Sequence, residues 1–98
     1  MTVLALIKLT AKKGQEDALD VAMQEPIAAT RANPECSRMQ LFANTEEPTN
    51  FLLVEEWTTI AAHERHVDDL MGKNVLGPMG EVSEGMPETL HYLETDTD

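Results

Sequence analysis

Apolar and polar residues alternate with a period of two in four short stretches of the chain, and this alternation predicts four β-strands. The stretches are residues 2–10, 36–43, 51–57 and 89–95. The first and third carry apolar residues on both faces, which is typical of strands in the interior of a sheet. Residues 44–50 are rich in turn-forming side chains, so the second and third strands are predicted to form an antiparallel hairpin.

A helical period separates the first two predicted strands. Residues 16–33 place Leu19, Met23 and Ile27 on one face, which predicts an amphipathic helix that packs on the sheet. Pro26 lies inside this pattern and has no amide hydrogen to donate. We therefore expect a kink or a restart of the helix at Pro26.

A second helix is predicted directly after the third strand. Ala62, Val67 and Leu70 recur at helical intervals, and Thr58 or Thr59 is available as the N-terminal cap. The strand should therefore lead into the helix within two residues. A glycine-interrupted, methionine-rich region follows, with a short helix expected over residues 75–82.

The order of these elements is strand, helix, strand, strand, helix, strand, which indicates a single α+β domain over residues 1–98. The expected architecture is ferredoxin-like, with a four-stranded antiparallel sheet. Two helices cover only one face of such a sheet, yet several strands are apolar on both faces. A second copy of the chain would cover the other face, so we expect a homodimer.

Composition excludes several classes of partner. The net charge is -11 and the seven Lys and Arg residues are scattered, which argues against a nucleic-acid partner. No apolar run reaches the roughly 20 residues that cross a bilayer, and the first residues lack the basic region of a signal peptide, so no membrane partner is expected. One cysteine forms no internal disulfide, which fits a reducing compartment. We expect a cytoplasmic protein.

The residues best able to do chemistry gather between Phe51 and His66. Glu55 shares a strand face with Trp57, and burial there would raise the pKa of its carboxyl group and suit it to acid–base catalysis. The alternative is a structural carboxylate paired with Arg31 or Arg65. Trp57 is a candidate to stack on an aromatic substrate, with a core position as the alternative.

The three histidines are weighed separately. His66 is the leading candidate for a general base, because histidine titrates near neutral pH. His63 is expected to be solvated, and His91 to be structural. His63 and His66 are three residues apart rather than the four of a zinc-protease helix, so no metal site is predicted. Cys36 is expected to be a small, buried side chain at the start of a strand.

Several residues together resemble a known family. They are Lys13-Gly14 after the first strand, Thr30, Arg31, Pro34 and Cys36 before the second, Pro48 and Phe51 in the hairpin, then Glu55, Trp57, Thr59, Ala61 and His66. In this arrangement the chain resembles the antibiotic biosynthesis monooxygenase domain, which includes quinol monooxygenases. The resemblance implies the ferredoxin-like fold and its assembly into a dimeric α/β barrel.

The resemblance also implies a function. Such enzymes oxidise a small reduced aromatic substrate, a quinol or a phenol, with O2 as the co-substrate and no metal, flavin or haem. The resemblance implies His66 as the proton acceptor, with Glu55 orienting or polarising the substrate and Trp57 lining its pocket. Met39 stands where many members have tyrosine and Met71 where many have a second histidine, so both are expected at the substrate pocket; core filling is the alternative.

Two other functions fit the same pattern. An isomerase or lactone-rearranging enzyme on this scaffold would use the same base and leave oxygen untouched. A non-catalytic dimer that binds a small ligand, such as a stress-associated accessory protein, is the second alternative. Turnover of substrate and consumption of oxygen distinguish these functions.

Overall fold

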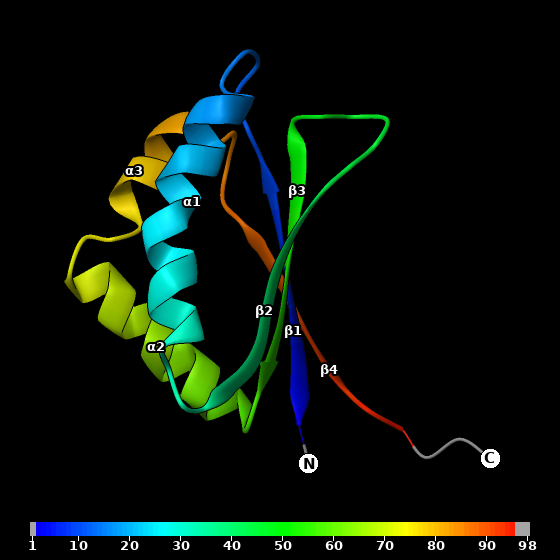
Figure 1. The fold of residues 1–98 in the computed structure, drawn as a ribbon, viewed down its shortest axis with the longest axis vertical. Coiled ribbons are helices and arrows are strands. Elements are labelled where there is room, and N and C mark those ends of the chain that lie inside the picture. The colour runs from blue at the N-terminus through cyan, green and yellow to red at the C-terminus, as the bar shows by residue number, and fades with distance from the viewer. Residues whose placement is uncertain (1, 96–98) are drawn as a thin grey trace.

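Four antiparallel strands form one sheet, and helices cover one of its faces (Figure 1). The computed structural model describes residues 2–95. Its elements are β1 (Val3–Thr10), α1 (Glu16–Arg31), β2 (Cys36–Ala43), β3 (Asn50–Trp57), α2 (Ile60–Gly72), α3 (Gly77–Val82) and β4 (Glu88–Leu93). The predicted ferredoxin-like α+β fold is confirmed, and most element boundaries differ from the expected ones by one or two residues.

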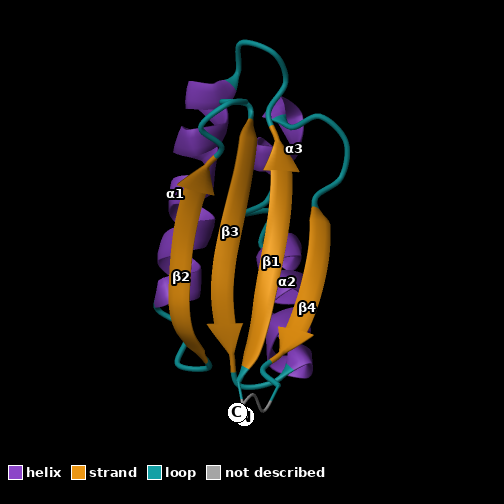
Figure 2. Cartoon of the chain, turned by 90° about the vertical axis from the view of Figure 1, so that its right-hand side faces the viewer, coloured by secondary structure: helices purple, strands orange, loops and turns teal. Residues whose placement is uncertain are grey.

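The strand order is β2-β3-β1-β4, so the two strands predicted to be interior do lie in the middle (Figure 2). The edges formed by β2 and β4 do not meet. One chain therefore has an open sheet and is not a barrel by itself. The dimeric barrel would be formed by two chains together, and it stays a prediction.

Helix α1 runs unbroken through Pro26, so the expected restart is wrong. Pro26 itself is buried, and its carbonyl oxygen accepts a hydrogen bond of 2.8 Å from the Thr30 hydroxyl. The apolar residues Leu19, Met23 and Ile27 lie in the core, as the helical period predicted. Their burial along the length of α1 offsets the backbone hydrogen bond that proline removes.

The join between β3 and α2 is as short as predicted. Strand β3 ends at Trp57 and α2 begins at Ile60. Between them, the side-chain oxygen of Thr59 accepts a hydrogen bond of 3.0 Å from the Ala62 amide, which makes Thr59 the N-cap. This cap fixes where the helix starts, and therefore which of its side chains face the sheet.

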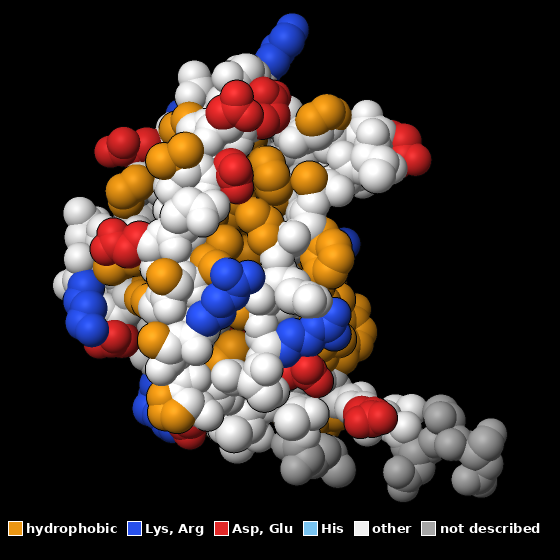
Figure 3. Space-filling model, in the orientation of Figure 1, with side chains coloured by type: hydrophobic (Ala, Val, Ile, Leu, Met, Phe, Trp, Pro, Cys, Tyr) orange, Lys and Arg blue, Asp and Glu red, His pale blue; other side chains and the backbone are white. Residues whose placement is uncertain are grey.

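The core lies between the sheet and the helices, where Figure 3 shows apolar side chains enclosed by the two layers. The opposite face of the sheet has no helix over it (Figure 2). It presents Leu4, Leu6, Phe42, Leu52 and Tyr92, of which Phe42 and Tyr92 are exposed. Among residues 2–95, no helix has the length and apolar character needed to cross a membrane.

Replacing the N-cap should destabilise the fold without touching the core. We expect Thr59→Ala to lower the free energy of unfolding by about 1 kcal/mol, because the Ala62 amide loses its side-chain acceptor. Urea denaturation followed by circular dichroism measures the change. Thr58→Ala keeps the cap and is the matched control; an equal loss in both variants would contradict the assignment.

Candidate functional site

One row of side chains crosses the whole sheet on its helix-covered face. The strand registers pair Met39 with Glu55, Glu55 with Ala5, and Ala5 with His91. The row therefore runs through β2, β3, β1 and β4 in turn. Ala5 is fully buried and has the smallest side chain of the four, which leaves space above β1 between Glu55 and His91.

Trp57 and Glu55 meet on this face because residues two apart on a strand point to the same side. The indole Nε1 donates a hydrogen bond of 2.7 Å to Oε1 of Glu55. Trp57 is fully buried and Glu55 is only 4% exposed. The pair thus satisfies two buried polar groups at once, since a buried indole N–H needs an acceptor and a buried carboxylate needs donors.

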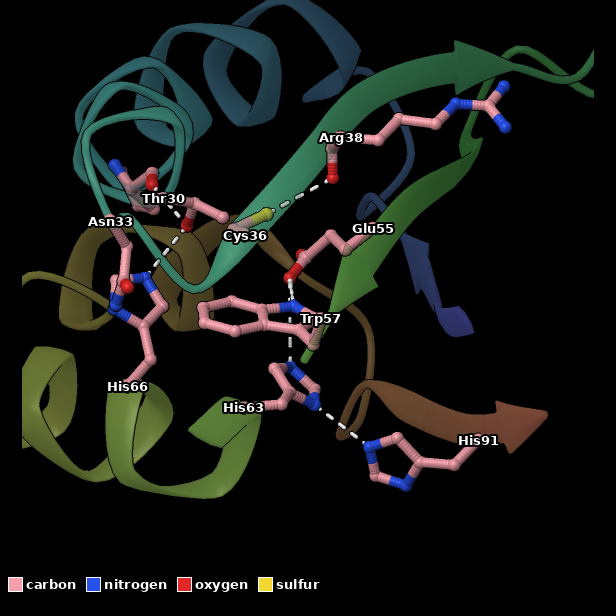
Figure 4. A network of polar contacts seen from close by, with 10 residues as sticks. Thr30, Asn33, Cys36, Arg38, Glu55, Trp57, His63, His66 and His91 are labelled. Atoms are coloured by element: carbon pink, nitrogen blue, oxygen red, sulfur yellow. Dashed lines mark hydrogen bonds and ion pairs between the residues drawn. The ribbon is translucent and has the colours of Figure 1, made fainter. Parts of the chain in front are cut away.

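His63 enters the same space from α2 and lies between the other two polar groups of the row. Its Nε2 is 3.7 Å from Oε1 of Glu55, and its Nδ1 is 2.8 Å from Nε2 of His91 (Figure 4). His63 is 4% exposed. The prediction that it is solvated is therefore wrong, because the start of α2 turns it toward the sheet.

His66 belongs to a neighbouring polar cluster that joins α2 to the end of α1. Its Nε2 lies 2.9 Å from the hydroxyl of Thr30, and its Nδ1 lies 3.2 Å from the side-chain nitrogen of Asn33. The Thr30 hydroxyl donates its one proton to the carbonyl of Pro26, so toward His66 it accepts. The proton of neutral His66 is thereby assigned to Nε2, and Nδ1 accepts from Asn33.

The two clusters meet at the indole. The ring centroid of Trp57 is 5.3 Å from that of His63 and 5.1 Å from that of His66 (Figure 4). The structure therefore brings together Glu55, Trp57 and His66, the three residues expected to form a site. It adds His63 and His91, which the sequence analysis did not place there.

The remaining site candidates lie apart from one another. Met39 is buried in the core beside Glu55 in the strand row. Met71 is 63% exposed on α2. Cys36 is half-buried at the start of β2, and burial raises the pKa of its thiol.

Neither Arg31 nor Arg65 pairs with Glu55, so the alternative of an arginine partner for this carboxylate is wrong. Arg31 donates to the backbone carbonyl of Met39, and Arg65 forms an exposed ion pair with Glu35. The partners of Glu55 are instead the indole and an imidazole. The carboxyl group is thus left without a permanent positive charge beside it.

Burial determines how the site titrates. It raises the pKa of the Glu55 carboxyl group, and the hydrogen bond from Trp57 opposes part of that rise. It lowers the pKa of His63 to about 4, with further lowering by His91 and His66. Burial also lowers the pKa of His66, although the charge of Asp69 opposes the change. Both buried imidazoles are consequently neutral at pH 7.

A groove on the described chain lies away from this cluster. It has a volume of about 560 Å³ and opens beside the β2–β3 hairpin, where it is lined by Thr10, Phe42, Asn50, Leu52 and Met86 among others. No group of three or more His, Cys, Asp and Glu side chains within residues 2–95 is placed to hold a metal ion. The polar cluster around Trp57 is the candidate site because it gathers the titratable side chains of the buried face, and the half-buried His91 is its least buried member.

Comparisons with known proteins identify the chain by family and by fold. A family model described as antibiotic biosynthesis monooxygenase matches residues 2–69. Among curated proteins, no sequence matches this chain.

Solved structures match over nearly the full length. SnoaB, described as a cofactor-independent oxygenase from Streptomyces nogalater, is 14% identical with a TM-score of 0.82, and the match covers 98% of this chain and 95% of SnoaB. Rv0793 from Mycobacterium tuberculosis is 18% identical with a TM-score of 0.83, covering 99% and 98%. A conserved protein from Methanosarcina mazei is 16% identical with a TM-score of 0.86, covering 97% and 94%.

The low pKa of His63 should make folding stability depend on pH. The unfolded chain binds a proton at this histidine near pH 6.5 and the folded chain only near pH 4, so stability falls as the pH drops through this window. Between pH 7 and pH 5 we expect His63 to account for a loss of about 2 kcal/mol. Glu55 acts in the opposite direction, because its raised pKa favours the folded state as the pH falls.

Urea denaturation of the wild type and of His63→Gln at pH 7 and pH 5 measures this contribution. We expect a smaller loss of stability in the variant, since glutamine does not titrate. Glu64→Gln, at an exposed neighbouring position, is the control and should keep the wild-type loss. Equal losses in wild type and His63→Gln would contradict the assigned shift.

Proposed function

Since the chain belongs to the antibiotic biosynthesis monooxygenase family, we propose that it is a monooxygenase that needs no cofactor and oxidises a small reduced aromatic substrate, a quinol or a phenol, with O2. One atom of O2 forms a new C–O bond in the substrate and the other leaves as water. The substrate itself supplies the electrons that reduce O2. The protein binds the ring and removes a proton.

The observation that carries this proposal is the buried carboxylate that faces Trp57 and His63 with no cation beside it. Deprotonating a phenolic hydroxyl requires a group whose pKa is shifted toward neutrality, and burial shifts the pKa of Glu55 in that direction. The fold shared with SnoaB supports the same assignment, because SnoaB is described as a cofactor-independent oxygenase.

The roles in this proposal follow from the contacts. Trp57 is fully buried, so its role is to position Glu55 through the indole N–H and to lie against the two histidines. His66 is the proton acceptor that the family resemblance implies. It would act through Nδ1 after Asn33 moves, because both of its ring nitrogens are hydrogen-bonded. Met39 and Met71 remain candidates for contact with the substrate.

Oxygen uptake tests the reaction directly. The purified, metal-free protein should consume O2 faster than autoxidation with at least one member of a panel of quinols and hydroxylated polycyclic aromatics. Glu55→Gln should slow this uptake by about 100-fold, the usual contribution of acid–base catalysis, because glutamine keeps the shape of the side chain but has no carboxylate to take part in proton transfer. An oxygen electrode measures both rates.

Glu64→Gln is the matched control, since it makes the same change at an exposed position on α2, away from both the cluster and the uncovered sheet face. It should keep the wild-type rate. In the same assay, His66→Ala tests whether His66 is the proton acceptor that the family resemblance implies. No uptake across the panel would contradict oxygenation and favour an isomerase or a ligand-binding protein.

We also propose that two copies of the chain pair through the uncovered face of the sheet. The half-buried Leu6 and Leu52 lie at the centre of this face, and the exposed rings of Phe42 and Tyr92 lie on its outer strands. A large apolar surface of this kind is stabilised by burial against another chain. A self-complementary pairing around a two-fold axis is the simplest arrangement that buries it.

Placing a charge in the middle of this face should separate the two copies. We expect Leu6→Lys to weaken the dimer by at least about tenfold, because a lysine buried there without a partner is costly. Sedimentation equilibrium measures the dissociation constant. Val21→Lys, at a position 72% exposed on α1, is the control; a monomeric wild type would contradict the pairing.

A further inference from the structure

His91, His63 and Glu55 form a continuous line of polar groups from the edge of the sheet to its interior. His91 lies on the edge strand β4 and is half-buried, whereas His63 and Glu55 are buried. The successive contacts are 2.8 Å between the imidazoles and 3.7 Å from His63 to the carboxylate (Figure 4). The line crosses β1 at the small side chain of Ala5, which pairs in register with both Glu55 and His91.

We propose that these three residues are a proton relay in which His91 takes a proton from the hydroxyl of the substrate and Glu55 receives one at the other end. The proposal rests on the proposed function for the substrate class. In this relay His91 contacts the substrate directly, through Nδ1. His63 and Glu55 act through His91 and do not touch the substrate.

The hydrogen-bond pattern assigns the starting position of each proton. The Nε2 of His63 lies 3.7 Å from Oε1 of Glu55, which is longer than a hydrogen bond. Because the carboxylate oxygen it faces can only accept, we place the hydrogen of neutral His63 on Nε2. Neutral His63 then has a bare Nδ1, which accepts from the Nε2–H of His91. The Nδ1 of neutral His91 is consequently bare, and it has no hydrogen-bond partner among residues 2–95.

The transfer is balanced over the three groups. The substrate O–H bond breaks as an N–H bond forms at Nδ1 of His91. His91 passes its Nε2 proton to Nδ1 of His63, and His63 passes its Nε2 proton to the carboxylate of Glu55. Both imidazoles end neutral in the opposite tautomer, and the negative charge moves from Glu55 to the substrate oxygen.

The surroundings of His63 favour transfer of a proton through its ring and disfavour a stable imidazolium there. Burial and the two neighbouring histidines, His66 and His91, disfavour an imidazolium at this position. Burial also makes Glu55 a better proton acceptor than an exposed carboxylate. The relay therefore gives a buried base access to a substrate at the surface, and it needs no displacement of Asn33 from His66.

The outer end of the relay lies among apolar residues. Leu93 is two residues from His91, on the same face of β4, and is 56% exposed. Ile60 is three residues before His63 on α2, on the same side of the helix, and is 40% exposed. These side chains suit the ring of an aromatic substrate whose hydroxyl meets the imidazole of His91.

Nitrogen NMR of 15N-histidine-labelled protein tests the relay without any substrate. At pH 8 we expect His63 and His91 both to carry their proton on Nε2, each with a bare Nδ1. Protonation of His63 on Nδ1, or of His91 on Nδ1, would overturn the proposed line of transfer. The His66 resonances are an internal control, with the proton on Nε2 set by Thr30.

Chemical rescue tests the catalytic role of His91. With an aromatic substrate that supports O2 uptake, His91→Ala should lower the rate by about 100-fold, and added imidazole should restore part of it. A structural role would not be rescued in this way. Thr89→Ala, on the same face of β4, is the control and should keep the wild-type rate.

The double variant Glu55→Gln/His91→Ala should be no slower than the slower single variant, because the two residues serve one transfer. Independent, multiplicative losses would overturn the relay. Absence of O2 uptake in the wild type would count against the proposed function alone, since the nitrogen resonances decide the relay separately.

Discussion

The helix-covered side of this sheet depends on one constraint, which is that a buried carboxylate needs hydrogen-bond donors around it. A carboxylate away from water is unstable unless donors surround it. The two groups nearest the buried oxygen of Glu55, the indole of Trp57 and the imidazole of His63, come from one stretch of chain that turns from strand to helix. The short join capped by Thr59 therefore sets the polar geometry as well as the start of α2.

A second polar cluster, around His66, also contacts the indole. His66 connects α2 to the last turn of α1 through Thr30 and to the following residues through Asn33. Because the rings of His63 and His66 both lie against Trp57, the position of the indole depends on both clusters. The two helices are thus held against the sheet by directional contacts in addition to apolar packing.

The strands were predictable because burying one face of a sheet forces alternation, and burying both faces leaves apolar runs. That reasoning located all four strands and placed β1 and β3 in the interior. The prediction that α1 restarts at Pro26 was wrong, because the packing of apolar residues along the whole of α1 outweighs the local effect of one proline.

The site was predictable only in part. Glu55, Trp57 and His66 were selected because they lie close together in the sequence and match the family pattern. His63 and His91 are 28 residues apart and meet only because β4 returns beside β1. Alternation on β4 places His91 on the face of Leu93, which was a usable signal. The orientation of His63 depends on which threonine caps α2, and the sequence left Thr58 and Thr59 as alternatives.

The place of β4 at the edge of the sheet has a consequence for the dynamics of the site. Only β1 pairs with β4, so fraying of this strand requires the loss of a single ladder of hydrogen bonds and leaves the core intact. Such an opening carries His91 away from His63 while Glu55 stays in place. The rate at which the interior carboxylate exchanges protons with water is therefore coupled to the opening equilibrium of one edge strand, and any contact that pins that strand also keeps the interior connected.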